Sequence, residues 1–577
     1  MLDEMSTRAL PARRFVPANL NLSDWNAIGP VAKQLQDRAI KSSQELETWL
    51  ADFSELYAAI DEYGSRAYIN KSCHTDNKEY EAKFLHYIES IEPELKPVMF
   101  ELQKKFLACE FAKDLPGVRY EMLRRMWKAE VDLFRPENVE IETAMTRLVN
   151  EYDKLSGAMM IDFRGSSYTP PQMARFLEDP DRATRGAAWT ALSNRRLVDR
   201  KRFDELFDEL RPMRARMAKN AGETDFRAYA FKSKQRFDYT PEDCVKFGDA
   251  VEKCVVPLVR KLAAKRKARL GVDVLRPWDL AVDPDNRAAL RPFDQRDIED
   301  FVRKTRQVFD RLSPDIARDF DQLKEHGNLD LDSRSGKQPG GYQSSLHESK
   351  QPFIFMNAAG LHRDVETLLH EGGHAFHLQW ASAVEPLVFL RHAPMEFCEV
   401  ASMSMEMLAM DHMDIFYGEG EDYARARRKQ LEDVIKFFPW MSTIDLFQHW
   451  IYTHPNHTLA ERTKEWLSLS SRFGAGEDWS GLEAVQESLW QRQLHLYHSP
   501  FYYVEYGIAQ LGAMQMWLKA KDDPKQALAN YKKALALGGT RTLPDLFKTA
   551  GLVFDFSEKT IAPLMRAVEE ELDSMPE

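Results

Sequence analysis

Apolar residues recur at helical spacing along most of the chain, with charged residues between them. Four stretches place apolar side chains at positions i, i+3, i+4 and i+7, and we expect helices in residues 31–65, 78–112, 118–155 and 187–220. A further helix is expected over residues 241–269. Thr240 is a good capping residue with Pro241 in the first turn behind it, and Gly271 suits a helix end.

Strand patterns are few. Residues 158–163 and 352–356 are short apolar runs rich in aromatic and β-branched side chains, and we expect a strand in each. Between them, residues 330–343 break the helical pattern with three glycines and Pro339, which predicts a loop. The chain is therefore expected to be mostly α-helical, with a small β element just before residue 360.

Charge and composition exclude several classes of protein. The sequence has 79 Lys and Arg against 91 Asp and Glu, a net charge of −12, which argues against nucleic acid as a partner. No apolar run approaches the length of about 18 residues that spans a membrane, and the first residues lack the apolar core of a secretion signal. The five cysteines are widely spaced without a CxxC pair, as in reduced thiols. We expect a cytoplasmic protein without a membrane partner.

Histidines concentrate in one region, since six of the fifteen fall within residues 362–412. There the motif His370-Glu371-Gly372-Gly373-His374 lies in a helical pattern. Spacing i, i+4 places both imidazoles on one helix face, where they can bind one Zn²⁺. Glu371 is rotated by about 100° from His370, so it can reach a zinc-activated water and act as its general base. The simpler alternative is a surface helix that happens to carry two histidines.

A third ligand is needed to complete such a site. His377 lies on the same face but one turn too far along the helix axis, so packing or support of a ligand is the more natural role. A second helical stretch, Pro394–Glu406, carries carboxylates through an apolar, Met-rich sequence. Buried carboxylates are costly unless they meet a cation or a donor. This favours Glu399 as the third zinc ligand and Glu406 as the partner that orients an imidazole.

The two glycines of the motif are unusual inside a helix, where each costs about 1 kcal/mol relative to alanine. They indicate a close approach to Gly372 and Gly373, either by the substrate backbone or by a facing helix. The sequence leaves both alternatives open.

The pattern TLLHEGGHAFH, followed by Glu399 within EFCEVASMSMEM, resembles the thimet oligopeptidase and oligoendopeptidase F family of zinc metallopeptidases (gluzincins). The similarity is greater to the oligoendopeptidase F branch. It extends to GKQPGGY, PFIFMNAAG, IDLFQHWIYTHP and HLYHSPFYYVEYGIAQLG, and more faintly to LEDPDRATRGAAW. Residues 1–150 match the family only in being helical. The resemblance implies one Zn²⁺ per chain, held by His370, His374 and Glu399, with Glu371 as base.

The role expected for the tyrosine-rich segment, residues 495–512, comes from the same resemblance. Read alone, it could be an aromatic core stripe. The family places a histidine and tyrosines there, facing the metal, and by position these match His495, Tyr503 and Tyr506. The resemblance implies that Tyr506, and second His495, stabilise the oxyanion formed in peptide hydrolysis. Tyr503 and Tyr502 are then expected to bind substrate.

Two further segments are implied to hold the peptide. Residues 352–356 resemble an edge strand that binds extended peptides through main-chain hydrogen bonds. The loop 336–342 would close over the peptide, with Gly341 and Tyr342 as contacts; its alternative is an ordinary surface loop. Relatives often carry a bulky residue where this chain has Gly372, which could alter the floor of the site.

The fold implied is two helical lobes enclosing a deep substrate channel, with a small β-sheet beside the zinc helix. We expect an N-terminal helical lobe over residues 1–200 and a catalytic domain over 201–577. The function expected is zinc-dependent endopeptidase cleavage of short unstructured peptides, by a monomer or a homo-oligomer.

Two alternatives remain at this stage. A dipeptidyl carboxypeptidase would need a cation for the substrate's C-terminal carboxylate, and Arg391 is a candidate. A non-catalytic, zinc-stabilised helical peptide binder is disfavoured by the intact Glu371 and the tyrosines.

Overall fold

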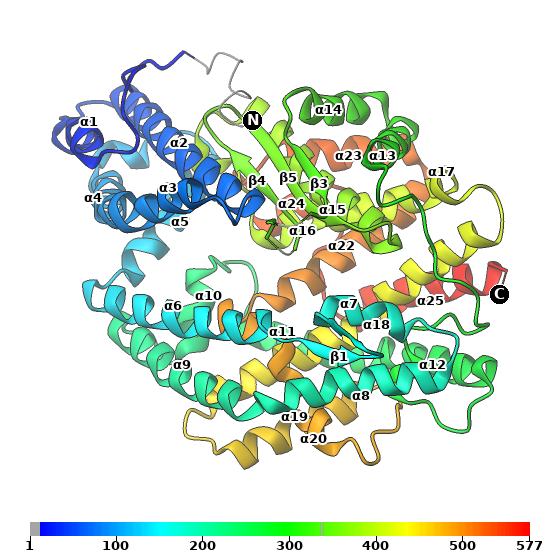
Figure 1. Cartoon of the computed structure of the whole chain (residues 1–577). Helices are drawn as coiled ribbons and strands as arrows, with labels where there is room; N and C mark the ends of the chain where they lie inside the picture. The colour runs from blue at the N-terminus through cyan, green and yellow to red at the C-terminus, as the bar shows by residue number, and fades with distance from the viewer. Residues whose placement is uncertain (1–11, 335, 339, 577) are drawn as a thin grey trace. The chain divides into compact units, whose positions relative to one another are not determined.

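A computed structural model describes residues 12–334, 336–338 and 340–576, and most of them are helical, as expected (Figure 1). The chain divides into two compact units built from discontinuous segments. The first unit contains the chain up to Asp132, Arg291–Arg427 and Ile508–Phe554, and the second contains Leu133–Leu290, Arg428–Gly507 and the chain from Asp555. The sequence-based division at residue 200, into a helical lobe and a catalytic domain, stays a prediction.

The first unit begins with a group of amphipathic helices: α1 (Trp25–Asp37), α2 (Ser43–Cys73), α3 (Lys78–His86), a π-helical turn (Tyr87–Ile91), α4 (Glu92–Ala108) and α5 (Val118–Leu133). The helix expected over 31–65 is therefore two helices. Ser42 accepts a hydrogen bond from the backbone N–H of Glu45, which starts α2 after a short break. These helices enclose a core that includes Trp49, Phe53 and Trp127.

This N-terminal core is completed by a segment from much later in the chain. Leu387 and Leu390 belong to the same buried cluster. The ring of Phe389 between them lies 4.7 Å from that of Phe53 and 5.1 Å from that of Trp127. The N-terminal helices are thus packed onto the part of the unit that follows Arg291.

A three-stranded sheet forms the β element of this unit, with β3 (Leu329–Asp332), β4 (Tyr342–Leu346) and β5 (Gln351–Ala358) in the order β3-β5-β4. β5 pairs parallel to β3 and antiparallel to β4. The expectation that residues 352–356 form an edge strand is therefore wrong. Their continuous run of buried side chains suits a central strand, and the edge beside β5 is β4.

The segment between β3 and β4 is mostly the loop expected from its glycines, although both strands extend into the range 330–343. Pro339, which helped to predict the loop, lies outside the described residues.

Helices surround this sheet. α15 (His362–Val384) packs against β4 and β5, and α16 (Met395–Ala409) packs against α15 (Figure 1). The other helices of this part of the unit are α13 (Ile298–Leu312), α14 (Pro314–Glu325), α17 (Asp414–Tyr417), α23 (Pro524–Leu535) and α24 (Leu543–Thr549). The hydroxyl of Tyr531 on α23 donates a hydrogen bond to the backbone oxygen of Ala401 on α16 at 2.6 Å, which ties a late helix to α16.

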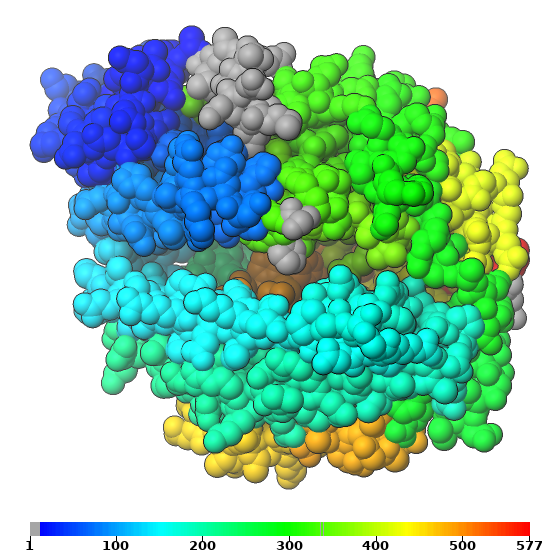
Figure 2. All heavy atoms as spheres, in the orientation of Figure 1, coloured from blue at the N-terminus to red at the C-terminus, as the bar shows by residue number. Residues whose placement is uncertain are grey.

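The second unit is almost entirely helical. Its elements are α6 (Pro136–Gly157), a hairpin of β1 (Ile161–Phe163) and β2 (Ser166–Tyr168), α7 (Pro170–Leu177), α8 (Arg182–Val198), α9 (Arg200–Ala221), α10 (Phe226–Ser233), α11 (Pro241–Cys254), α12 (Val256–Leu270), α19 (Leu459–Phe473), α20 (Glu483–Glu487), α21 (His495–His498) and α25 (Glu558–Ser574). Helices α18 (Glu421–Thr453) and α22 (Tyr503–Asp522) each begin in one unit and end in the other. In Figure 2, α6 to α8, coloured cyan to teal, form a large part of the surface of this unit that faces the viewer.

The ends of the helix expected over 241–269 are confirmed, but its interior is not continuous. Thr240 forms a capping box with Asp243, and Gly271 closes α12 with a positive φ of 65°. The helix breaks at Val255, where Pro257 sits in the first turn of α12 and cannot supply the N–H that an uninterrupted helix would use.

Within the described residues, we find no helix that combines the length and the apolar character needed to cross a lipid bilayer. All five cysteines are described, and none of them forms a disulfide bond.

Candidate metal centre

The HEGGH motif lies on α15, and the sheet fixes where that helix begins. β5 ends at Ala358, and α15 starts at His362 after a tight connection. The carboxylate of Asp364 accepts hydrogen bonds from the backbone N–H groups of Ala359 at 2.7 Å and Leu361 at 2.8 Å. The first turn is therefore anchored to the end of a buried central strand, which holds the motif in place.

Three side chains from α15 and α16 converge on one point. Nε2 of His370 lies 3.4 Å, and Nε2 of His374 3.6 Å, from Oε2 of Glu399. The three ligand atoms all lie within 4.8 Å of one another. Ligand atoms about 2 Å from a tetrahedral zinc are about 3.3 Å apart, so this donor set fits a zinc ion. The structure brings together the three ligands that the sequence predicts.

A carboxylate orients one of the ligands. Nδ1 of His370 lies 2.6 Å from Oε1 of Glu406, about two turns beyond Glu399 on α16. This contact turns Nε2 of His370 toward Glu399, as is usual for an imidazole that binds metal. Ser402 also donates a hydrogen bond to Oε2 of Glu399 at 3.1 Å. Glu406 thus contacts His370, and the supporting role expected for it from the sequence stays a prediction.

The protonation of the two imidazoles follows from their surroundings. Burial lowers the pKa of His374 to about 4, so its ring is neutral at pH 7, the form that binds metal. Burial also acts to lower the pKa of His370, but hydrogen bonds to Glu399 and Glu406 outweigh it and raise that pKa well above its ordinary value. The two carboxylates thus favour positive charge at this point, and a divalent cation would supply it.

Glu371 lies beside the ligands but is not one of them. Its side chain is buried, and burial raises its pKa to about 7; the charge of His370 and a hydrogen bond from the backbone of Gln343 act in the opposite direction. A carboxylate with a pKa near neutrality can both accept and return a proton at pH 7. The contact with Gln343 also places Glu371 next to the edge strand β4.

The two glycines of the motif serve helix packing. A Cβ on Gly373 would lie 2.6 Å from the backbone oxygen of Ala401 and 2.6 Å from Cα of Ser402, so α16 approaches α15 at this point. A Cβ on Gly372 would lie 3.0 Å from the ring of Phe309 on α13. Of the two explanations that the sequence left open, the structure favours facing helices for both residues.

Two other candidates lie apart from this centre. His377 is buried outside the ligand set, and burial lowers its pKa to about 3. The guanidinium of Arg391 donates to three backbone oxygens, those of Glu385, Pro386 and His347, at 3.1, 2.9 and 2.7 Å. All three of its nitrogens are thereby engaged within the unit.

The loop between β3 and β4 is anchored by a buried ion pair. The side chain of Lys337 is fully buried, and its Nζ lies 2.8 Å from Oδ1 of Asp330. Arg334 binds both oxygens of the same carboxylate, at 2.5 and 2.7 Å. Neither contact was evident in the sequence, where the loop appears only as a run of glycines and polar residues.

Gly341 and Tyr342, the contacts expected for substrate, lie at the end of this loop. A Cβ on Gly341 would be in contact with the Thr367 side chain on α15 at 3.5 Å, so the backbone there runs close to the metal helix. The ring of Tyr342 stacks on Phe355 at 4.8 Å, and its hydroxyl bonds to Ser72 at 2.5 Å. The Tyr342 side chain is therefore part of the packing, and a ligand would contact Tyr342 through its backbone on β4.

The remaining predicted residues form an aromatic cluster in the second unit, on α21, just before α22 and in the first turn of α22. The ring of His495 lies 5.0 to 5.9 Å from the rings of Tyr502, Tyr503 and Tyr506. Nδ1 of His495 lies 2.6 Å from Nε2 of Gln493, and all four rings are half-buried. The structure brings the four predicted residues together, and their role toward the metal ligands stays a prediction.

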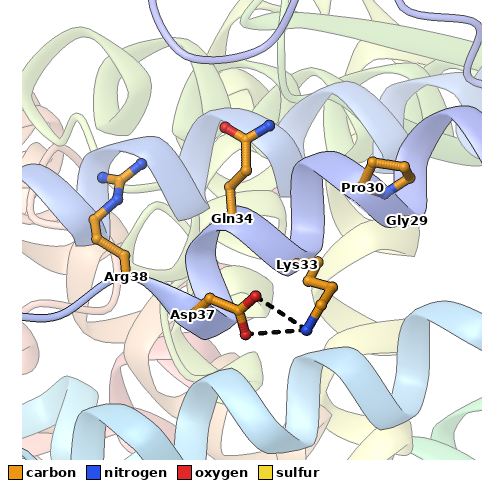
Figure 3. Close-up of a pocket in the computed structure, with 6 residues that line it drawn as sticks. All are labelled: Gly29, Pro30, Lys33, Gln34, Asp37 and Arg38. Atoms are coloured by element: carbon orange, nitrogen blue, oxygen red, sulfur yellow. Dashed lines mark hydrogen bonds and ion pairs between the residues drawn. The ribbon is translucent and has the colours of Figure 1, made fainter.

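A surface hollow elsewhere carries no comparable chemistry. It has a volume of about 620 Å³ and lies along one face of α1, lined by Gly29, Pro30, Lys33, Gln34, Asp37 and Arg38 (Figure 3). Of its three charged groups, Lys33 and Asp37 pair with each other at 3.0 Å, and Arg38 pairs with Asp52 at 2.6 Å. This is the exposed side of a single amphipathic helix.

Comparison with known proteins agrees with the site. The family model "Peptidase family M3" matches residues 175–565, and "Peptidase M3 N-terminal domain" matches residues 15–134. The N-terminal part, which the sequence showed only as helical, thus matches a domain of the same family. An oligoendopeptidase F homolog of Borreliella burgdorferi is 24% identical over 309 residues, 52% of this chain and 50% of that protein. The chain spans about half the length of the curated relatives it matches.

Solved structures match over nearly the whole length. A crystal structure provisionally named oligoendopeptidase F superposes with a TM-score of 0.89 at 29% identity, covering 98% of this chain and 99% of the other. PZ peptidase A, solved with an inhibitor, also gives a TM-score of 0.89, at 27% identity, covering 97% and 99%. With the family model covering most of the sequence, the chain belongs to peptidase family M3, in its oligoendopeptidase F branch.

Proposed function

We propose that this protein is a zinc-dependent endopeptidase that hydrolyses internal bonds of short, unstructured peptides. The observation that carries the proposal is the convergence of His370, His374 and Glu399, with Glu371 buried beside them but outside the ligand set. Three protein ligands leave one position of a tetrahedral zinc open, which is the arrangement of a catalytic rather than a structural site.

The chemistry divides between the metal and the protein. When bound, zinc supplies the positive charge that acidifies a water molecule and polarises the peptide carbonyl. The carboxylate of Glu371 accepts a proton from the attacking water, and its protonated form then donates that proton to the nitrogen of the leaving amine. A pKa near 7 suits both steps, because neither form of the group is scarce at neutral pH.

Donors for the developing oxyanion are proposed in the aromatic cluster of the second unit. The Tyr506 phenol is the first candidate and the His495 imidazole the second, while Tyr503 and Tyr502 are proposed to bind the peptide. Half-buried rings grouped at the start of α22 support this proposal, since a pure core stripe would be buried throughout. A positioned donor is worth about 10²- to 10³-fold in kcat.

The peptide itself is proposed to add to the sheet at β4. Within the described residues, β4 pairs with β5 on one side only, and its Gln343 contacts Glu371 through the backbone. An extended peptide beside β4 would gain main-chain hydrogen bonds independent of its sequence. Gly341, next to α15, would contact the same peptide.

The expected substrate channel and cytoplasmic location stay predictions, and the absence of disulfides among the five cysteines is consistent with a reducing compartment.

Endopeptidase cleavage is favoured over release of C-terminal dipeptides. A dipeptidyl carboxypeptidase must bind the terminal carboxylate of its substrate, and Arg391, the cation considered for this role, already donates from all three nitrogens to backbone oxygens. A non-catalytic peptide binder would have no use for a buried Glu371 with a pKa near neutrality.

The test is hydrolysis of an internally quenched nonapeptide by wild type and by Glu371→Gln, with products identified by mass. Glu371→Gln should keep its zinc, measured by elemental analysis, and lose several orders of magnitude in kcat, because the amide cannot accept a proton from water. Near-normal turnover by this variant would contradict the mechanism.

The same peptide with a free and with an amidated C-terminus separates the two modes of cleavage. An endopeptidase cuts both forms at internal bonds. Release of C-terminal dipeptides from the free form alone would show the exopeptidase, and no cleavage of any of a varied peptide set by the zinc-loaded protein would show the binder.

A further inference from the structure

A second group of potential metal ligands lies in the second unit. Cys244 on α11 and Asp445 and His449 on α18 place a sulfur, a carboxylate oxygen and an imidazole nitrogen within 4.8 Å of one another. All three residues are buried, with exposed fractions of 2%, 1% and 5%. Asp445 and His449 are one helical turn apart, so both face the same way from α18. None of the three has a part in the proposed peptidase chemistry.

The two helices are held together at this point by close packing. A Cβ on Gly248, one turn after Cys244, would lie 2.8 Å from the side chain of Leu446, the neighbour of Asp445. A Cβ on Gly507, at the start of α22, would lie 2.4 Å from Met441, one turn before Asp445. The Cys244, Asp445 and His449 side chains are therefore fixed by a tight helix contact on both sides.

Asp445 and His449 are left without hydrogen bonds in this interior. Neither carboxylate oxygen of Asp445 and neither ring nitrogen of His449 has a hydrogen-bond partner, and all four atoms are buried. Nε2 of His449 lies 3.2 Å from Oδ2 of Asp445, but the alignment does not make a hydrogen bond. Buried polar groups are almost always paired, because leaving one unpaired costs about 1–3 kcal/mol. An ion pair alone would still leave Oδ1 and Nδ1 unsatisfied.

The surroundings do not supply the missing partners. The edge of the Phe501 ring lies against His449 with centroids 5.2 Å apart, and the Phe231 ring lies 6.1 Å away. Both of these aromatic residues are buried. These two rings thus present apolar surface, and no hydrogen-bond partner, to His449.

We propose that Cys244, Asp445 and His449 bind a second zinc ion, which links α11 to α18. Thiolate, imidazole and carboxylate together are a donor set that zinc accepts, and the 3.2 Å between nitrogen and oxygen matches the spacing of about 3.3 Å around a tetrahedral ion. With the thiol deprotonated and the imidazole neutral, the two negative charges balance Zn²⁺, so no net charge is buried. A water molecule completes the coordination. The zinc content then rises from the one per chain expected from the HEGGH motif to two.

The sulfur ligand gives this site a signature that the first centre lacks. Cobalt(II) replaces zinc in such sites, and a thiolate ligand adds a sulfur-to-cobalt charge-transfer band in the near ultraviolet, whereas two histidines and a glutamate do not. The full-length protein reconstituted with cobalt should show this band. Cys244→Ser should lose it, and Cys254→Ser, on the same helix but outside the cluster, should keep it. His374→Ala should also keep it, because that change affects only the first centre.

Metal content gives the second readout. Wild type should hold two zinc ions per chain, while Cys244→Ser, His449→Gln and His374→Ala should each hold one. Wild type with one zinc and no charge-transfer band would overturn the proposal, as would a band lost in His374→Ala or a second zinc retained by both Cys244→Ser and His449→Gln. If the variants do not fold, as judged by circular dichroism, the wild-type cobalt spectrum decides alone.

The two proposals fail separately. An active peptidase without the sulfur band would remove only the second site. An inactive protein that shows the band would leave the second site standing and remove the proposed function.

Discussion

At Gly373 the backbone of α16 comes close to α15, the helix that carries the HEGGH motif. The atoms that a side chain would meet there are backbone atoms of α16, at 2.6 Å, which cannot move without moving the helix that carries Glu399. Gly372 instead faces the ring of Phe309, and a side chain can move more easily than the backbone of a helix. A glycine in the metal motif thus sets the distance between ligands from two helices.

Gly373→Ala should therefore lower the free energy of unfolding by about 2 kcal/mol or more, through forced separation of α15 and α16. Gly157→Ala is the matched control: Gly157 ends α6, has no atom within 4 Å of the added Cβ, and should lose no stability because alanine favours helix. Urea unfolding of both variants measures the difference. Equal stabilities would show that the close approach of α16 does not constrain residue 373.

Tyr506 and Tyr502 are neighbours in the aromatic cluster, with ring centroids 5.1 Å apart, yet their proposed roles differ. Tyr506→Phe should lower kcat about 10²- to 10³-fold with little change in KM, because it removes a donor to the transition state. Tyr502→Phe should mainly raise KM. Steady-state kinetics on the quenched nonapeptide, with zinc content as a control, test both. A Tyr506→Phe enzyme that retains full kcat would exclude the phenol as the oxyanion donor.

Among the elements, the β3–β4 connection is anchored by the carboxylate of Asp330. Burial acts to raise the pKa of Asp330, but hydrogen bonds from Arg334, Cys73 and Lys337 outweigh it and hold that pKa well below its usual range. Since Lys337 is fully buried, Asp330 is what makes its charge tolerable there. The connection that ends at Gly341 is thus anchored at its start.

Asp330→Asn should lower the free energy of unfolding by about 3 kcal/mol at pH 7, because a buried ammonium loses its counter-ion. The folded pKa lies below the unfolded value of about 3.9, so the stabilisation is complete above that pH and declines as pH falls toward the folded pKa. The difference between wild type and variant should therefore stay constant from pH 7 to 5 and shrink at pH 3. Urea unfolding at these three pH values measures it.

Asp332→Asn is the control for this prediction. Its carboxylate contacts Arg334 at 2.8 Å but is half-exposed, so its loss should cost less than about 1 kcal/mol. A wild-type-to-Asp330→Asn difference that did not change with pH would show that the ion pair is not the source of the stability.

At the scale of the whole molecule, each unit takes its parts from distant stretches of sequence. The core of the N-terminal helices includes Leu387, Leu390 and the packed ring of Phe389, so it is not complete without this later segment. A fragment of residues 133–577 should expose these apolar side chains. It should aggregate or bind a hydrophobic dye, and its unfolding should lose cooperativity. A fragment that unfolds with one sharp transition would contradict this view of the core.

Local patterns in the sequence predicted much of this architecture. Helical periodicity located many of the helices, the capping residues Thr240 and Gly271 located ends correctly, and i, i+4 spacing with the carboxylates of a second helix singled out His370, His374 and Glu399, which the structure brings together. Breaks within helices, such as the one at Val255, were missed because apolar periodicity continues across them and proline is tolerated in a first turn.

What the sequence could not show depends on partners far along the chain. The central place of β5 is decided by β3 and β4 pairing on both its sides, which no pattern within residues 352–356 reveals. The same holds for Asp330 with Lys337 and for Cys244 with His449. Each residue is ordinary in its own segment and acquires a role only when folding brings the segments together.

The discontinuous first unit also has a consequence for synthesis on the ribosome. Helices α1 to α5 emerge first, but the residues that cover their apolar faces, Leu387 to Leu390, follow long afterwards. At translation rates of about 5–20 residues per second, the delay is on the order of tens of seconds. Over that interval the nascent chain carries an uncovered apolar surface, the kind that ribosome-associated chaperones bind, and its native contacts with Leu387 to Leu390 form only once the chain has passed α15.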